Sequence, residues 1–147
     1  MISYVDEVEV RNQTESNEEM WNAVNTMDEK PGFGEGHDEQ TFLGLRTALE
    51  QANEHNFIVL FSDEPGNVTD LAIKQEVIDL KEKTESKIFF LVRPHANKRN
   101  NQTQEESLDS MKLNFNEIGT VIDITMHDKE ETLTQIIEEL TKSQICL

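Results

Sequence analysis

The sequence predicts an α/β protein with a three-layer, doubly wound and mostly parallel sheet. Three short apolar runs, Phe57–Ser62, Lys87–Arg93 and Thr120–Thr125, are typical of strands that are buried on both faces. Segments with helical periodicity separate these runs, and such an alternation favours parallel strands with helices on both faces of the sheet. We therefore expect the three strands to be neighbours in one parallel sheet.

Each predicted helix has one apolar face. The apolar positions are Met20, Val24 and Met27 in a helix capped at Ser16; Phe42, Leu45, Leu49 and Ala52 within residues 39–54; Ile73, Val77 and Leu80 within residues 69–83; Leu108, Met111, Phe115 and Ile118 in a helix closed by Gly119; and Leu133, Ile136, Ile137 and Leu140 in a helix that starts at Asp128.

One further strand is predicted near the N-terminus. Residues Ile2–Val10 alternate in part between apolar and polar side chains, which predicts a single half-exposed strand at an edge. Four strands are a short inventory for this fold class, so the architecture looks incomplete on its N-terminal side. We predict one domain over residues 1–143 and a short tail over residues 144–147.

The composition excludes some partners. The chain has 147 residues, 30 acidic against 13 basic, and a net charge of −17. Nucleic acids and anionic membrane surfaces need Lys and Arg patches, so both are disfavoured. The charge suits a soluble secreted protein, a cation-binding surface or a basic partner, and its simplest role is solubility. No apolar stretch reaches transmembrane length, and no signal-peptide pattern follows Met1.

Asp63 is the first candidate for a site residue. It follows the strand Phe57–Ser62 directly, and sites in open α/β sheets form at the carboxyl ends of the strands. The alternative is that Asp63 accepts hydrogen bonds from backbone amides within its own turn.

The glycine-rich segment 30–38 is a weak candidate for a phosphate-binding loop. Such loops follow a strand and precede a helix, whereas a predicted helix precedes this one, and Glu35, Asp38 and Glu39 would repel phosphate. The remaining interpretations are a flexible loop and the acidic rim of a cation site.

These features together resemble the von Willebrand factor type A fold, in the variant found at the amino end of hemicentins. In that variant a loop rich in Gly, Asp and Glu precedes a helix ending in Ala-Leu, as residues 34–39 precede Ala48-Leu49 here. A strand ending in Thr-Asp or Ser-Asp follows, like Ser62-Asp63, and then a helix and a strand similar to KIFFLV. The resemblance covers roughly Ser3 to Leu140 in element order and is strongest from Gly34 to Pro94.

The resemblance implies a degenerate or absent metal-dependent adhesion site. Type A domains hold a cation with an Asp-x-Ser-x-Ser loop, a threonine from a second loop and an aspartate from a third. The aspartate matches Asp63, Asp38 or Thr41 is nearest to the threonine, and the Asp-x-Ser-x-Ser motif has no counterpart. Either the chain is a fragment that begins after the first strand and helix of the fold, or it is a divergent member. Calcium or magnesium is the implied cation, held weakly because hard cations take about six oxygen ligands.

A receiver-like signalling domain is the alternative function. Asp63-Glu64-Pro65-Gly66 is similar to the phosphoacceptor turn of response regulators, but Asp6-Glu7 falls inside its strand and Lys129 comes late after the last strand.

The resemblance also implies an extracellular setting. Three sequons, at Asn12, Asn67 and Asn101, fall in predicted loops and agree with secretion. The single cysteine, Cys146, allows no internal disulfide and could bridge to a neighbouring domain of a longer multidomain chain. We expect a non-enzymatic matrix or cell-adhesion module that binds protein partners through the loops around Asp63, Asp38 and Asn67. We also expect the isolated chain to associate through its sheet edge.

Overall fold

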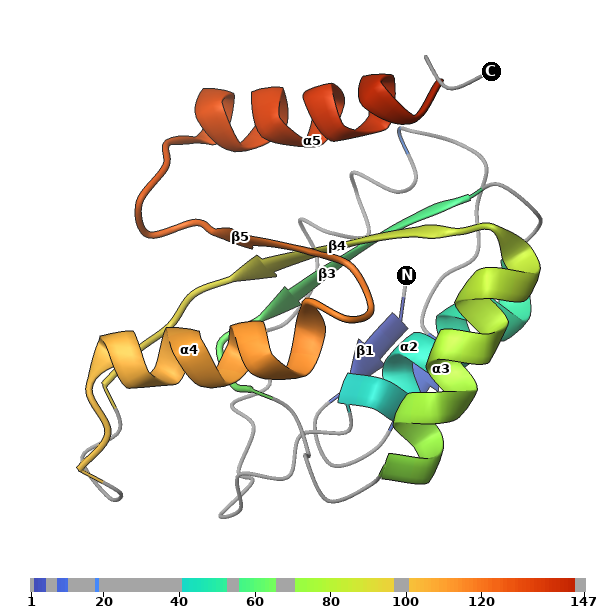
Figure 1. Ribbon diagram of the computed structural model, residues 1–147, viewed down its shortest axis with the longest axis horizontal. Helices are drawn as coiled ribbons and strands as arrows, with labels where there is room; N and C mark the ends of the chain where they lie inside the picture. The colour runs from blue at the N-terminus through green and yellow to red at the C-terminus, as the bar shows by residue number, and fades with distance from the viewer. Residues whose placement is uncertain are drawn as a thin grey trace.

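The computed structural model describes residues 2–4, 8–10, 18, 41–52, 56–65, 71–96 and 101–144. Within them lies a three-layer α/β fold, with the strands in the middle layer, α5 (Lys129–Gln144) on one side and α2 (Thr41–Gln51), α3 (Leu71–Thr84) and α4 (Gln104–Phe115) on the other (Figure 1). The prediction of helices on both faces of a parallel sheet is confirmed.

The parallel sheet has the strand order β3-β4-β5. Strand β3 (Phe57–Ser62) pairs in parallel with β4 (Lys87–Val92), in a register that places Val59 opposite Phe89. Strand β4 pairs in parallel with β5 (Thr120–Asp123). The three predicted strands are therefore neighbours, although β5 ends at Asp123 rather than at Thr125 because Ile124 and Thr125 already belong to a turn.

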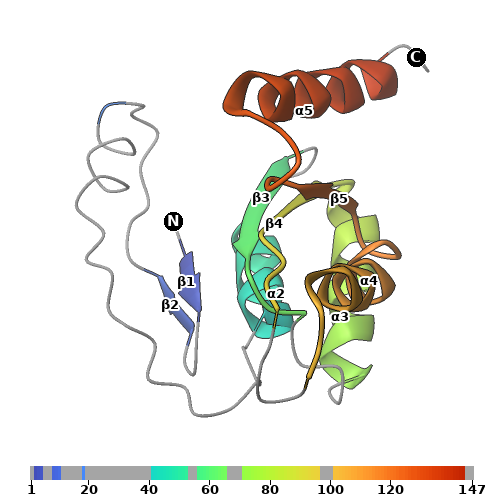
Figure 2. The same cartoon turned by 90° about the vertical axis from the view of Figure 1, so that its left-hand side faces the viewer.

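The N-terminal prediction was wrong in one respect. Instead of one strand over Ile2–Val10, the structure has two, β1 (Ile2–Tyr4) and β2 (Val8–Val10), which pair in an antiparallel way as a separate two-stranded sheet. Weak, partial alternation specifies the register of a strand poorly, so it did not exclude a reversal of the chain within the segment. The hairpin lies against α2, beside the three-stranded sheet (Figure 2).

The main core lies between the sheet and the three helices α2, α3 and α4. Phe115 of α4 is fully buried, stacks on Phe90 of β4 at a centroid distance of 4.4 Å and meets Phe42 of α2 edge to face at 6.2 Å. The other buried members of this cluster are Leu45, Leu49, Leu60, Val77, Ile88, Val92, Met111 and Ile118. We call this side of the sheet the closed face.

Gly119 connects α4 to β5 within the closed face. Its amide donates to the Phe115 carbonyl at 2.9 Å, in agreement with the predicted helix closure. A Cβ atom at this position would lie 2.3 Å from the Ile88 carbonyl oxygen of β4. Glycine is therefore required here by the close approach of two backbones.

The opposite side of the sheet, which we call the open face, has a much smaller core. It consists of Phe89, Leu91 and Ile122, against which Ile136 of α5 packs. The prediction that Phe57–Ser62 is buried on both faces was wrong, because Phe57, Val59 and Phe61 are exposed on this side. The predicted inner face of the last helix was also partly wrong, since Leu133 and Ile137 are exposed. A single helix covers this face within the described residues, and it does not reach over β3.

Some expectations fall outside the described residues. They concern the helix with Met20 and Met27, of which only Glu18 is described and is helical, and the glycine-rich segment 30–38. The start of α4 is described: Thr103 is its N-cap and Gln104 its first residue.

Candidate functional site

The carboxyl ends of the three parallel strands meet at one edge of the sheet, as the strand order predicts. Asp63 and Glu64 follow β3, His95 follows β4 at a short distance, and Asp123 is the last residue of β5. This edge is where open α/β sheets place their binding loops, and it gathers the candidate residue Asp63 with side chains that are distant in the sequence.

The turn after β3 is organised by Ser62 rather than by Asp63. The buried Ser62 hydroxyl donates to the Glu64 carbonyl at 2.7 Å and accepts from the Glu64 amide at 3.3 Å. Asp63 is exposed, and its carboxylate makes no hydrogen bond or ion pair with any described residue. Within the described part of the turn, the Ser62 hydroxyl and not the Asp63 carboxylate accepts a hydrogen bond from a backbone amide. The Asp63 carboxylate is presented to the outside.

Two longer-range contacts fix this loop. Asn114 of α4, only 4% exposed, donates from Nδ2 to the Pro65 carbonyl at 2.7 Å. Glu64 lies 3.4 Å from His95 Nε2, an ion pair when the histidine is protonated. The loop that carries Asp63 is thus tied to α4 and lies against the segment after β4. Such pre-organisation lowers the entropic cost of binding a partner.

Sequence reasoning missed Asn114. The residue is 49 positions from Pro65, so no local pattern joins the two. The available signal was a polar side chain between Met111 and Phe115 on the apolar side of a helix. A buried amide there must find a hydrogen-bond partner.

The end of β5 is closed on itself. The Asp123 carboxylate accepts from the Thr125 amide at 2.8 Å and from the Thr125 hydroxyl at 2.6 Å. Asp123 is thereby engaged in an Asx-type turn. Among the described acids at this edge, Asp63 is the one without such a contact.

The three predicted metal ligands are only partly placed. Thr41 is the first residue of α2 and fully buried, and its Oγ1 finds no hydrogen-bond partner in the described structure. A buried hydroxyl without a hydrogen-bond partner is expected where a ligand would supply that partner. Asp38, however, lies outside the described residues, and those that are described contain no group of three His, Cys, Asp or Glu side chains able to hold a metal. The described residues alone do not supply the ligand set of a divalent cation, and the degenerate site stays a prediction.

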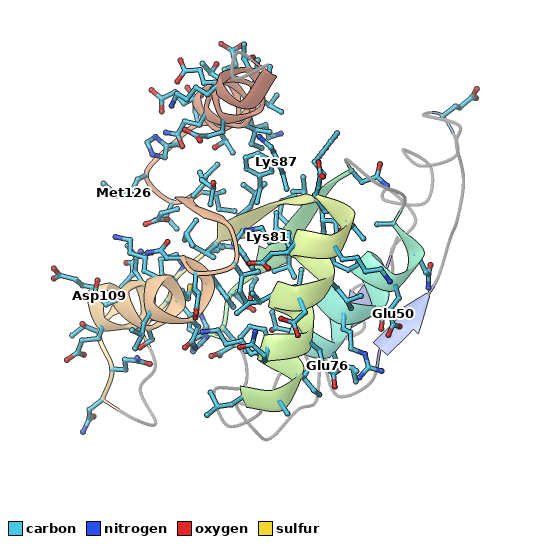
Figure 3. The ribbon with its side chains drawn as sticks, turned by 45° about the vertical axis from the view of Figure 1, so that its right-hand side comes forward. Glu50, Glu76, Lys81, Lys87, Asp109 and Met126 are labelled. Atoms are coloured by element: carbon cyan, nitrogen blue, oxygen red, sulfur yellow. The ribbon has the colours of Figure 1, made fainter. Side chains whose placement is uncertain are left out.

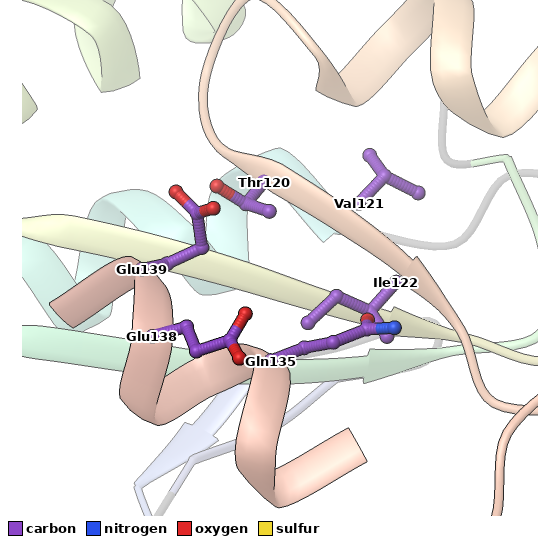
Figure 4. Close-up of a pocket in the computed structure, with 6 residues that line it drawn as sticks. All are labelled: Thr120, Val121, Ile122, Gln135, Glu138 and Glu139. Atoms are coloured by element: carbon purple, nitrogen blue, oxygen red, sulfur yellow. The ribbon is translucent and has the colours of Figure 1, made fainter. Parts of the chain in front are cut away.

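A pocket lies along β5, the outer strand on the far side of the sheet from β3. It is a small pocket between β5 and α5, lined by Thr120, Val121 and Ile122 of the strand and by Gln135, Glu138 and Glu139 of the helix (Figure 4). Its strand residues pair with Phe89–Leu91 of β4, and β4 separates them from β3, which Asp63 follows. The pocket is therefore separate from the candidate site.

The sequence model of the von Willebrand factor A domain matches residues 1–122, most of the chain. The chain belongs to this family. No curated protein and no solved structure gives a significant match. The type A match ends within β5, before α5 begins, so the predicted domain limit at residue 143 is not tested by it.

Membership agrees with the parallel sheet flanked by helices. Type A domains usually act as non-catalytic protein-binding modules. None of the helices in the described part of the chain is long and apolar enough to cross a membrane. The structure adds no support for a receiver domain. Lys129 is the first residue of α5, and residues 124–128 separate it from the end of β5.

Proposed function

We propose that this type A domain is a non-enzymatic adhesion module of the hemicentin-like kind, which binds a protein partner of the extracellular matrix or cell surface. The observation that carries the proposal is the exposed Asp63 carboxylate on a loop that Ser62 and Asn114 hold in place. A fixed, unengaged charge gives an interface orientation and specificity. The predicted neighbours in the contact surface, Asp38 and Asn67, lie outside the described residues.

The extracellular part of the proposal is supported by one described sequon. Asn101 is exposed in a turn with a φ of 51°, and Thr103 is exposed two residues later. A glycan at this position would extend away from the protein without displacing a buried group. The other two sequons, at Asn12 and Asn67, and the proposed inter-domain cysteine Cys146 lie outside the described residues.

The proposal is tested by binding to purified matrix proteins. The full chain is passed over immobilised fibrillar collagen, laminin and fibronectin in biolayer interferometry, with and without millimolar calcium or magnesium. We expect binding to at least one of them, weakened about tenfold or more by Asp63→Ala because a charged contact at the centre of the surface is lost. Asp109→Ala is the matched control, since Asp109 is an exposed acid on α4 (Figure 3) and its loss changes the net charge equally.

Two results would contradict the proposal. One is the absence of binding to every protein of the panel, and the other is equal weakening by Asp63→Ala and Asp109→Ala, which would reduce the effect to net charge.

A separate experiment tests the receiver alternative: the chain is incubated with acetyl phosphate and magnesium and then analysed by mass spectrometry. An aspartyl phosphate at Asp63 that Asp63→Asn abolishes would replace the adhesion proposal by a signalling one.

A further inference from the structure

The open face of the sheet exposes a row of apolar side chains on β3. Ile58 and Leu60 point into the closed face, so the alternation of a strand sends Phe57, Val59 and Phe61 to the other side. There they are 59%, 37% and 65% exposed. The register places Val59 beside the buried Phe89, so the exposed row is continuous with the small core under α5.

Helix α5 exposes apolar side chains next to this row. Ile136 packs on the sheet, and Gln135 and Glu139 face β5 across the small pocket (Figure 4). Helical geometry then places Leu133 and Ile137 on the other flank of Ile136, toward β3. They are 58% and 60% exposed. We call these five residues, Phe57, Val59, Phe61, Leu133 and Ile137, the β3–α5 surface.

Charges of opposite sign mark the two ends of this surface. Asp63 follows β3 at its carboxyl end and is exposed. Lys87, the first residue of β4, lies next to Phe57 in register and on the same side of the sheet as Phe89, toward α5 (Figure 3). Between these ends, Phe57–Ser62 has no charged residue. A two-fold axis perpendicular to β3 reverses the direction of the strand, so it brings the acidic end of one copy to the basic end of another.

We propose that two copies of this chain associate through the β3–α5 surface about a two-fold axis perpendicular to β3, with Asp63 of each copy facing Lys87 of the other. A two-fold interface requires a surface that is complementary to itself, and this one carries both charges and the apolar contact between them. Monomeric proteins rarely leave contiguous apolar patches of this kind uncovered. The net charge of −17 opposes self-association elsewhere, but exposed charges beyond about 8 Å are largely screened at physiological salt.

The first test is the oligomeric state of the full chain by sedimentation velocity, from sub-micromolar to about 100 μM protein in buffer with physiological salt. We expect a discrete dimer, which Ile137→Lys converts to a monomer or weakens at least tenfold, because a lysine would be buried against apolar groups. Leu113→Lys is the matched control: Leu113 is 79% exposed on α4, on the other side of the molecule, and its substitution should leave the dimer intact.

Val59→Lys gives a second variant on the strand side of the surface, with circular dichroism to verify that each variant is folded. A wild-type chain that stays monomeric over the whole range overturns the proposal. So does a dimer that both Ile137→Lys and Val59→Lys leave unchanged, since its interface would lie elsewhere. Open-ended growth instead of a discrete dimer would indicate strand-edge aggregation and also overturn it.

A charge exchange tests the two-fold arrangement itself. Asp63→Lys and Lys87→Asp should each weaken the dimer about five- to tenfold, because each places like charges opposite one another. The double variant restores opposite charges and should recover most of the wild-type affinity. Simple additivity of the two losses would rule out the arrangement. The dimer and the proposed matrix contact would both use Asp63, so they exclude one another at that residue. Ile137→Lys removes the dimer and leaves the Asp63 loop untouched, so matrix binding that is retained or strengthened in this variant separates this proposal from the proposed function.

Discussion

The two faces of the sheet are built from the same strands and reach very different degrees of burial. On the closed face, three helices cover the sheet, and Phe90, Phe115 and Met111 are completely excluded from solvent. On the open face, Ile136 of α5 packs on three buried residues, while Phe57 at the end of the same sheet is more than half exposed. The difference follows from how many helices the described chain places on each face.

Strand β3 shows what this comparison teaches. Its residues alternate between the two faces, so Leu60 and Val59 are neighbours in the sequence but differ in burial, the first buried and the second exposed. Both are apolar, and the apolar character of a residue does not decide whether another element covers it. An exposed apolar row on an ordered strand then becomes the natural place for a second protein surface.

The largest contrast between the faces is expected from removing one aromatic ring on each. Phe115→Ala should lower the free energy of unfolding by about 3–5 kcal/mol, because a cavity is left between α4, β4 and α2. Phe57→Ala should change it by about 0.5 kcal/mol or less, since most of that ring already contacts water. Urea unfolding of both variants at sub-micromolar concentration, where self-association contributes least, measures the difference. Equal losses would mean that the open face is covered in solution.

A smaller contrast is expected between the caps of the helices that cover each face. Helices α4 and α5 both start with reciprocal side chain–backbone hydrogen bonds, from Thr103 and Glu106 in one and from Asp128 and Glu131 in the other. Thr103→Ala should cost about 0.5–2 kcal/mol of global stability, because α4 carries Phe115 into the core. Asp128→Ala should mainly accelerate local amide exchange in α5, which is anchored less deeply.

Native-state hydrogen exchange, together with urea unfolding, distinguishes the two effects, and Thr103→Ser is the control that keeps the cap.

The same contact at the start of α4 predicts a pH dependence of stability. The Thr103 backbone N–H, and then its hydroxyl, lower the pKa of Glu106 below 4.5. A lowered pKa means that the fold favours the ionised form, so this contribution is present above pH 4.5 and is lost as the pH falls through the lowered value. Glu106→Gln should remove that acid-side dependence, and an unchanged pH profile would contradict the role of the cap.

The smallest effect is expected at the carboxyl edge, where both faces end. The described residues around Asp63 do not form a complete set of ligands. We therefore expect the dissociation constant for calcium or magnesium to be about millimolar, so that a millimolar concentration of the cation fills about half of the sites. That would stabilise the fold by about 0.4 kcal/mol, or about 1–2 °C in Tm. Thermal unfolding of the wild type and of Asp63→Ala with and without each cation measures the shift. A large rise that Asp63→Ala abolishes would show that a complete cation site forms.

Much of the fold could be predicted because its signals are local. The apolar runs gave β3, β4 and β5 and their parallel order, helical periodicity gave α2, α3, α4 and α5, and Gly119 marked the end of α4. The hairpin β1–β2 could not be predicted, because its weak alternation does not fix where the chain reverses. Of the candidate site, Asp63 was predicted from its place after a strand. Its supports, Asn114 and the pair of Glu64 with His95, were not, since they join segments that only the folded sheet brings together.

The sequence by itself determined the order of strands and helices, the family and the edge of the sheet at which Asp63 is presented, because these follow from periodicity and from residues adjacent in the chain. The tertiary structure decided which face of each element is covered. Leu133 and Ile137 have the same helical pattern as Ile136, yet only Ile136 packs against the core. Periodicity identifies the apolar face of an element, but burial needs a second element opposite it, and the packing of the whole chain determines where that element lies.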